Sequence, residues 1–257
     1  MKLYLKFFAI HLKSEMAYPG AFFLRCIGRI LLTVNSLLGI HVMLWRFGGI
    51  AGYTAGEVLL GFGVVKTAFS LAECFARGFD RFDHIVRQGS FDRLMVRPRG
   101  LIFQTVCQDI RLDALPDTLL SFLVIFYGVR AVAISWNAAR ILVLLSMILC
   151  GSLLFFGAFL LYAALCFYTY EGLELFNIFT HGIRTYSQFP FDIYGRGILF
   201  FTTCVIPMAM VQTWPLRYLT GRGGWIYGLF PIASLWFLLP CYAVWRRGAR
   251  HYCSAGS

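Results

Sequence analysis

The sequence predicts an all-α membrane protein with six transmembrane helices, and three observations support this fold class. The chain has 257 residues, of which 59% are hydrophobic and only 14% are charged, whereas soluble domains carry about 25% charged residues. Its mean hydropathy is +0.71. The apolar residues gather in long runs, and about 20 apolar residues cross a bilayer core as one helix. The composition therefore excludes an ordinary soluble enzyme and an intrinsically disordered protein.

The first 18 residues predict an amphipathic helix that lies on the membrane surface. Lys6 and Lys13 alternate with Phe7 and Ile10, a pattern typical of helices that lie in the plane of the interface. We find no compact apolar core followed by a small-residue cleavage site, so we expect this helix to be retained rather than removed as a signal peptide.

Six apolar stretches follow the surface helix, and each is long enough to cross a bilayer. They occupy residues 22–45, 57–77, 115–134, 141–167, 198–216 and 226–245. Arg25 and Arg29 lie near the start of the first stretch, where long basic side chains can reach the interface. We treat residues 1–257 as a single transmembrane domain.

The positions of Lys and Arg predict that both termini lie in the cytoplasm. Most basic residues between the stretches fall in segments that are cytoplasmic in this orientation, and cytoplasmic loops of membrane proteins carry the excess of Lys and Arg. Two long polar insertions, 78–114 and 168–197, then face the cytoplasm. The same bias accounts for the net charge of +11 without a nucleic-acid partner.

Motifs for nucleotide binding or hydrolysis are not found, so we assign no catalytic residue. Residues 61–67 contain the Lys-Thr pair of a phosphate-binding loop, but Val65 stands where that loop needs glycine. The eight cysteines are scattered singly, most of them in apolar stretches, which predicts neither a disulfide framework nor a zinc site. We assign no metal and no cofactor to this chain.

Asp109, Asp113 and Asp117 are spaced by four residues and would share one face of a helix. Such a face could bind a cation, or serve an intramembrane enzyme that modifies lipids. The interpretation that we favour is a solvated cytoplasmic base of the third span, with Arg111 as partial charge compensation.

Lys66 lies in the middle of the second span. A charge at this depth costs about 2.5–3.5 kcal/mol on insertion scales, so it is expected to face protein or water. Glu73 follows seven residues later on the same helix face. Two interpretations stay open for Lys66: it lines a substrate pathway or subunit interface, or a neighbouring helix neutralises it. The small-residue spacings Gly52–Gly56 and Gly224–Gly228 are weak indications of dimerisation.

The first cytoplasmic loop predicts a short helix over residues 90–97 with an exposed apolar face. Phe91, Leu94 and Met95 share that face at helical spacing. The helix signals are Ser90 as N-cap, Asp92 in the first turn, Arg97 in the last turn and Pro98 as the stop. We expect the face to dock into a partner, so that Leu94→Asp would abolish coupling without affecting insertion; packing on the membrane surface is the alternative.

Residues 89–98, Gly-Ser-Phe-Asp-Arg-Leu-Met-Val-Arg-Pro, resemble the coupling-helix segment of ABC-2 family transporter permeases. The branch that they resemble comprises small six-span bacterial subunits encoded apart from their ATPase. Other segments similar to this branch are residues 12–18, 189–194, 205–207, 214–221 and 248–256. The resemblance extends over nearly the whole chain, with mild departures such as Pro19 after Tyr18.

The resemblance implies an ABC-2, type V exporter-like permease in the bacterial cytoplasmic membrane. Two permeases, identical or paralogous, would enclose the pathway, and two copies of a separate ATP-binding subunit would hold ATP and Mg and dock on the helix at 90–97. It also implies that Pro207 breaks the fifth span near its outer end and that Pro215 starts a re-entrant external gate. The alternatives are an intramembrane lipid-modifying enzyme and an ATP-independent channel or carrier.

Overall fold

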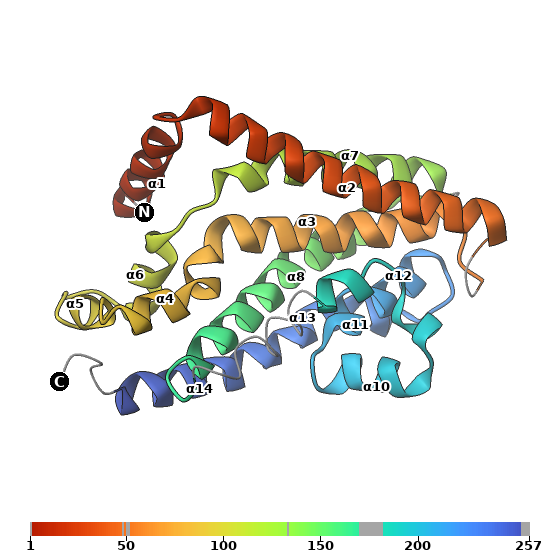
Figure 1. Cartoon of the computed structure of the whole chain (residues 1–257). Helices are drawn as coiled ribbons and strands as arrows, with labels where there is room; N and C mark the ends of the chain where they lie inside the picture. Colours follow the sequence, from red (N-terminus) through yellow and green to blue (C-terminus); the bar gives the residue numbers. More distant parts are fainter. Residues whose placement is uncertain (1, 48, 50–51, 133, 170–181, 253–257) are drawn as a thin grey trace.

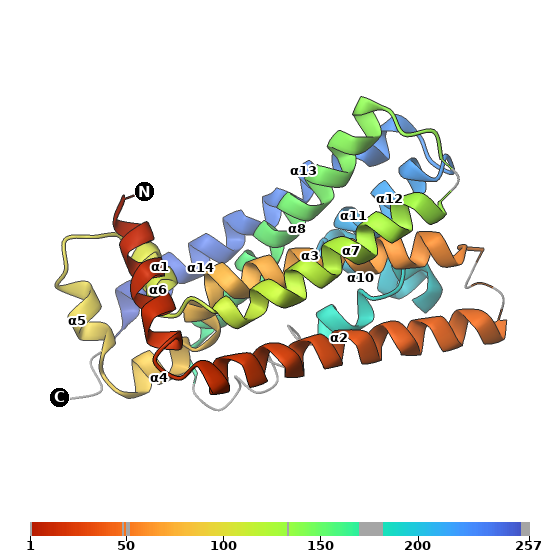
Figure 2. The same ribbon diagram turned by 90° about the horizontal axis from the view of Figure 1, so that it is seen from above.

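The computed structural model describes residues 2–47, 49, 52–132, 134–169 and 182–252, and the regular elements in these ranges are helical. The predicted all-α fold class is therefore confirmed. The longest helices run side by side along one elongated bundle, and both ends of the chain lie at the same end of it (Figures 1 and 2). We call this the terminal end and the other the opposite end.

The first part of the described chain contains nine helical elements, four of which are long. They are α1 Lys2–Glu15, α2 Pro19–Phe47, α3 Ala55–Asp80, α4 Phe82–Arg87, α5 Phe91–Met95, α6 Leu101–Gln108, η1 Leu112–Ala114, α7 Leu115–Ala131 and α8 Ala138–Leu165. The second half contains η2 Phe191–Tyr194, α10 Arg196–Cys204, α11 Met208–Val211, α12 Thr213–Leu219, η3 Trp225–Leu229, α13 Phe230–Ala233, η4 Ser234–Phe237 and α14 Leu238–His251.

Five helical segments of the described chain have the length and apolar composition of a membrane span, and each overlaps a predicted one. They are Pro19–Arg46, Ala55–Arg87, Leu112–Ala131, Ala138–Leu165 and Trp225–His251. In place of the remaining predicted span, over 198–216, the structure has two helices, Arg196–Cys204 and Met208–Leu219. The two helices are bent by 85° at the break between them.

Helix α3 forms the centre of the bundle. It begins with a capping box in which the Thr54 hydroxyl accepts from the backbone N–H of Glu57 and the Glu57 carboxylate accepts from that of Thr54. Glycines let α7 approach closely: a Cβ on Gly63 would lie 2.8 Å from the Ile125 side chain, and one on Gly128 would lie 2.9 Å from the Leu60 backbone. The bundle thus buries α3 along most of its length.

Helix α2, in contrast, lies at the periphery, where Figure 2 shows it along one side of the bundle. Its buried residues are Cys26, Thr33, Ile40 and Leu44, which form one narrow stripe at helical spacing. The other faces of α2 carry exposed large apolar side chains such as Leu24 and Leu31, as expected of a span that faces lipid.

The bent pair α10–α12 does not follow the predicted course of a fifth span. Gly61, near the start of α3, adjoins the side chains of Gln212 and Leu216, whereas Gly151 in mid-α8 adjoins Ala68 and Val211. Helices α11 and α12 therefore run from the middle of the bundle to its opposite end.

This course corrects the predicted positions of both prolines. Pro207 lies directly before α11 and therefore at mid-depth, not near the outer end. Pro215 lies in the first turn of α12, where its missing N–H costs no helical hydrogen bond, so the returning segment starts at Met208. A gate role for the two prolines stays a prediction.

The prediction that all of 168–197 faces the cytoplasm is wrong for residues 187–194. The backbone N–H of Phe191 donates to Thr213 Oγ1 at 2.9 Å, and Gln212 Nε2 donates to the Ser187 carbonyl at 2.8 Å. The Tyr53 hydroxyl, from the loop between the first two spans, donates to Asp192 at 2.7 Å. These hydrogen bonds hold the segment at the opposite end of the bundle, away from the end that contains both termini (Figure 1).

One glycine of each small-residue spacing serves a contact inside the chain, whereas a Cβ on Gly52 or Gly224 would meet no atom within 4 Å. A Cβ on Gly56 would lie 3.0 Å from Ala131, and one on Gly228 would lie 3.1 Å from Val143. These glycines let α3 approach the end of α7 and let η3 approach α8, so neither glycine is an indication of dimerisation.

Candidate functional site

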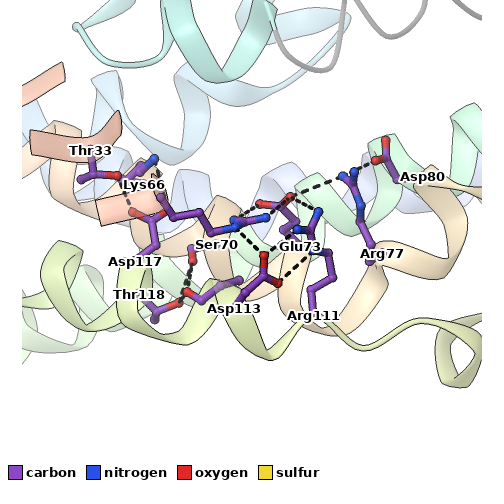
Figure 3. Close-up of polar contacts among 12 residues, drawn as sticks. Thr33, Lys66, Ser70, Glu73, Arg77, Asp80, Arg111, Asp113, Asp117 and Thr118 are labelled. Atoms are coloured by element: carbon purple, nitrogen blue, oxygen red, sulfur yellow. Dashed lines mark hydrogen bonds and ion pairs between the residues drawn. The ribbon is translucent and has the colours of Figure 1, made fainter. Parts of the chain in front are cut away.

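Eight buried or largely buried charged side chains meet between α2, α3 and the start of α7 (Figure 3). We call them the charge network. Its carboxylates are Glu73, Asp80, Asp113 and Asp117, and its basic groups are Arg29, Lys66, Arg77 and Arg111. Four formal negative charges thus face four positive ones. Balance of this kind is what makes ionised groups tolerable at membrane depth.

Glu73 is the centre of the charge network. Both of its carboxylate oxygens accept from Arg29, through Nη1 and Nη2, at 2.8 Å each, the bidentate geometry that makes arginine–carboxylate pairs strong. Arg77, one helical turn along α3, donates to the same carboxylate at 3.3 Å. Arg111 Nη1 lies 3.9 Å from it. One buried carboxylate therefore faces three guanidinium groups.

Arg29 also joins the network to η1. Its Nε donates to Asp113 at 3.0 Å, while Arg111 donates to the same carboxylate through Nε at 2.9 Å and Nη2 at 2.5 Å. Arg77 pairs with Asp80 at the end of α3. A single arginine of the peripheral helix α2 thus contacts carboxylates from two separate parts of the bundle.

Lys66 pairs with Asp117 of α7 at 3.2 Å, and both side chains are buried. The Thr33 hydroxyl of α2 also donates to Asp117, and Ser70 and Thr118 share a hydrogen bond of 2.7 Å one turn along. Of the two interpretations of Lys66, this geometry fits neutralisation by a neighbouring helix. The sequence did not identify the partner, although Asp117 lies near the start of an apolar stretch and so gave a signal for one.

The three aspartates do not share a helix face, and the favoured interpretation is wrong about a solvated base, although Arg111 does pair with Asp113 as predicted. Helix α6 ends at Gln108, and Asp109 and Arg111 have extended backbone, which interrupts the spacing of four. Asp113 and Asp117 are 1% and 2% exposed and belong to the charge network, whereas Asp109 pairs with Arg81. Within the described ranges, no three potential metal ligands come together.

Removing one member of the Lys66–Asp117 pair is expected to destabilise the bundle strongly. Lys66→Met leaves the Asp117 carboxylate buried without its cation, a loss of about 3–5 kcal/mol in the free energy of unfolding. The double variant Lys66→Met/Asp117→Leu removes both charges and is expected to recover most of that loss. Denaturant unfolding in detergent of the wild type, Lys66→Met, Asp117→Leu and the double variant measures the coupling free energy between the two residues. Independent, additive effects of the two changes would contradict the pairing.

A second polar cluster lies at the opposite end of the bundle. Asp192 accepts from the Tyr53 hydroxyl at 2.7 Å and from Arg217 at 2.8 Å, and Arg222 donates to both oxygens of Glu57 at 2.9 Å. Burial raises the pKa of the Tyr53 hydroxyl to about 12, so Tyr53 stays protonated as a donor at neutral pH. This cluster ties the Tyr53 loop, η2 and α12 together. The sequence did not predict this cluster, because only Asp192, a carboxylate in an aromatic stretch, gave a signal.

The loop predicted as a docking helix contains α5, but its apolar face is not exposed as expected. Phe91 is 0% and Leu94 is 2% exposed, whereas Met95 is 48% and Val96 is 86% exposed. The Ser90 hydroxyl donates to the Ile85 carbonyl at 3.0 Å and does not cap α5. Because Leu94 is packed inside the chain, Leu94→Asp would unfold the segment and does not test docking alone. The exposed side chains of this segment are Arg93, Met95, Val96, Arg97, Pro98 and Arg99.

Phe91 holds α5 in an aromatic cluster that reaches three long helices. Its ring centroid lies 5.4 Å from that of Phe82, 5.1 Å from Phe167 and 4.8 Å from Tyr252, in edge-on geometry. Members of the aromatic cluster are Phe79, Phe82, Phe91, Phe167, Trp245 and Tyr252. The ends of α3, α8 and α14 therefore share one rigid contact with α5, which lies at the terminal end in Figure 1.

Comparisons with known proteins bear on this arrangement. The family model described as ABC-2 family transporter protein matches residues 30–256, nearly the whole chain. No curated protein and no solved structure gives a significant match. The matched range includes the charge network apart from Arg29, the α5 segment and the bent pair α10–α12. Because the family model matches residues 30–256, the chain belongs to the ABC-2 family of transporter proteins and is a membrane-spanning component of an ABC transporter.

Proposed function

We propose that this chain is the permease subunit of an ATP-driven exporter in the bacterial cytoplasmic membrane. Two permease copies, or one copy and a paralogue, enclose the pathway, and both termini lie in the cytoplasm. Two separate ATP-binding subunits hold ATP and Mg and dock at the terminal end. Membership of the ABC-2 family supports the permease role and an ATP-binding partner. The anchoring of α5 is the observation that carries the docking assignment.

The packing of α5 gives it the properties of a coupling element. Its outward side, with Met95 and Val96 flanked by Arg93 and Arg97, is free to bind a partner. Its inward side is fixed by Phe91 in the aromatic cluster. A displacement of α5 by the ATPase would therefore move the ends of α3, α8 and α14 together rather than bend a loose loop.

Helix α2 is the span best suited to shift against the others. It buries one narrow stripe of residues, and Arg29 and Thr33 link it to carboxylates of the charge network. Ionic and hydrogen-bonded contacts of this kind can exchange between discrete arrangements. ATP binding can drive such an exchange only if it favours one arrangement in free energy. We assign this two-state role to the contacts that α2 makes with α3, η1 and α7.

The two alternative functions receive less support. An enzyme using the three aspartates would need them on one face, but Asp113 and Asp117 are engaged in ion pairs and Asp109 lies apart. A carrier would need intramembrane charges available to its substrate, and the eight groups of the charge network are paired with one another.

Purification of the chain together with the products of its neighbouring genes tests the proposal. We expect mass spectrometry of the intact complex to find two permease copies and two copies of a P-loop ATPase. Identical permease masses would indicate a homodimer, and two different masses a heterodimer. A chain that purifies without an ATPase and turns over a lipid substrate unaided would overturn the proposal in favour of an enzyme. Flux without ATP would favour a channel or carrier.

Charging the outward side of α5 is expected to uncouple the ATPase without unfolding the permease. In Met95→Asp/Val96→Asp two exposed apolar side chains become carboxylates, and the co-purified ATPase is expected to fall about tenfold or more. The free energy of unfolding of the permease is expected to stay unchanged because both side chains are exposed. The matched control is Leu94→Asp, which puts a carboxylate at a buried position and lowers unfolding stability as well. Full retention of the ATPase by Met95→Asp/Val96→Asp would contradict docking on α5.

A further inference from the structure

A groove at the terminal end of the bundle lies between α1 and the segment that links α5 to α6. Its volume is about 500 Å³. Apolar side chains line its α1 side, and two arginines stand on the linking segment. The lining residues used below are Leu3, Phe7 and Ile10 of α1, Phe103 of α6, and Arg97 and Arg99. In Figure 2, α1 lies across the end of α2 rather than along it, as a helix on a membrane surface does.

Contacts on both sides of the groove fix its walls. On one side, a hydrogen bond of 3.1 Å joins His11 Nε2 of α1 to the Cys107 carbonyl of α6. Burial raises the pKa of the Tyr4 hydroxyl on the inner face of α1 to about 12. The His11 hydrogen bond docks α1 on the bundle, while Leu5 and Leu12 on another face stay exposed, as expected if that face enters the headgroup region of the membrane.

On the other side, Gln104 holds the turn that carries the two arginines. Its Nε2 donates to the Arg99 carbonyl at 2.8 Å and to the Leu94 carbonyl at 3.0 Å, and Gln104 is 8% exposed. The backbone N–H of Arg99 donates to the Arg97 carbonyl at 2.7 Å. The backbone positions of Arg97 and Arg99 are thus set before any ligand arrives.

The charges around the groove have the sign that attracts an anion. The side chains of Arg97 and Arg99 are exposed, and neither forms an ion pair with the part of the chain that the structure describes. Lys6 and Lys13 are exposed on α1. Guanidinium groups bind phosphate oxygens in bidentate fashion, and basic pockets on the cytoplasmic side of membrane proteins bind anionic lipid headgroups.

We propose that this groove binds one anionic phospholipid of the cytoplasmic leaflet. Its phosphate lies against Arg97 and Arg99, and part of an acyl chain lies along Leu3, Phe7, Ile10 and Phe103. The lipid would connect the surface helix α1 to the segment that follows α5. This inference does not depend on the ATP-binding partner, because the isolated chain contains the whole site.

Native mass spectrometry of the purified chain with phosphatidylglycerol and with phosphatidylcholine tests the proposal. We expect one phosphatidylglycerol to bind in preference to phosphatidylcholine. Arg97→Gln/Arg99→Gln is expected to lower the affinity for phosphatidylglycerol about 25-fold, since each basic residue near the anionic group raises this affinity about fivefold. Arg97→Lys/Arg99→Lys keeps the charge and is expected to retain most of the binding.

A matched control separates the groove from general surface charge. Arg246→Gln/Arg247→Gln removes two exposed arginines from α14 at the same end of the bundle and is expected to leave phosphatidylglycerol binding unchanged. Phe103→Asp keeps both groove arginines but introduces a carboxylate beside the apolar wall, and is expected to weaken binding.

Three results would overturn the proposal. The first is equal loss in the groove variant and in the α14 control, which would indicate nonspecific attraction. The second is displacement of the lipid by inorganic phosphate alone, which would indicate a phosphate site without an acyl-chain contribution. The third is the absence of bound phosphatidylglycerol from the wild-type chain while Arg97→Gln/Arg99→Gln loses the ATPase, which would assign the two arginines to the ATPase interface.

Discussion

Glu73→Ala is expected to lower the free energy of unfolding by about 3–5 kcal/mol, because it removes the carboxylate on which three arginines converge. The Glu73 side chain is 6% exposed and that of Arg29 is 16% exposed, so water cannot replace the lost partner. Arg29 would retain Asp113, but the network would carry an excess positive charge. Denaturant unfolding in detergent or lipid measures the loss.

Glu57→Ala is the matched control for this experiment. Glu57 lies on the same helix, and both residues are 5% exposed. Its salt-bridge partner, however, is one arginine whose side chain is 41% exposed. Loss of this pair and of the cap at Thr54 is expected to cost about 1 kcal/mol. If the two variants lost equal stability, burial of a carboxylate rather than convergence of arginines would explain the effect.

Gly78→Ala is expected to force α6 away from α3, with a loss of about 3 kcal/mol, at the upper end of the usual cost of overpacking. A Cβ at this position would lie 1.9 Å from the carbonyl oxygen of Thr105 and 2.9 Å from its carbon. These are backbone atoms of α6, and a change of side-chain rotamer cannot relieve the overlap. The unfolding midpoint of the variant in detergent measures the loss.

Gly61→Ala provides the comparison on the same helix. A Cβ there meets the side chain of Gln212 at 3.4 Å, an ordinary contact. Since alanine favours a helix over glycine by up to about 1 kcal/mol, this variant is expected to be as stable as the wild type or slightly more stable. A Gly78→Ala variant that behaves like Gly61→Ala would show that α6 does not need its close approach to α3.

Hydropathy predicted those parts of the fold that depend on a helix and its solvent alone. The five long apolar segments were found because each must satisfy its own backbone hydrogen bonds in lipid. The helix predicted at 1–18 from its alternation of lysine and apolar residues is present as α1 from Lys2 to Glu15, and its place on the membrane surface stays a prediction. These properties are local, so a single sequence contains them.

Properties that depend on distant partners were not predicted. Asp192 has the sequence signature of a loop residue, and its position beside Tyr53 follows from a contact 139 residues apart. The sequence predicted Phe91 and Leu94 to be exposed. The rings that cover Phe91 belong to Phe167 and Tyr252, which lie more than 70 residues further along the chain. Lys66 was recognised as unusual, but nothing near it in sequence identified Asp117 as its partner.

The charge network also constrains how the chain is made. Lys66 on α3 precedes its partner Asp117 in the chain, and Arg29 on α2 precedes Asp113, which it contacts across a separation of 84 residues. During translation the early spans therefore carry charges whose partners arrive with the third. The first three spans cannot reach their final environment one by one. The pairs Lys66–Asp117 and Arg29–Asp113 can form only after residue 117 has been made and its helix has joined the first two spans.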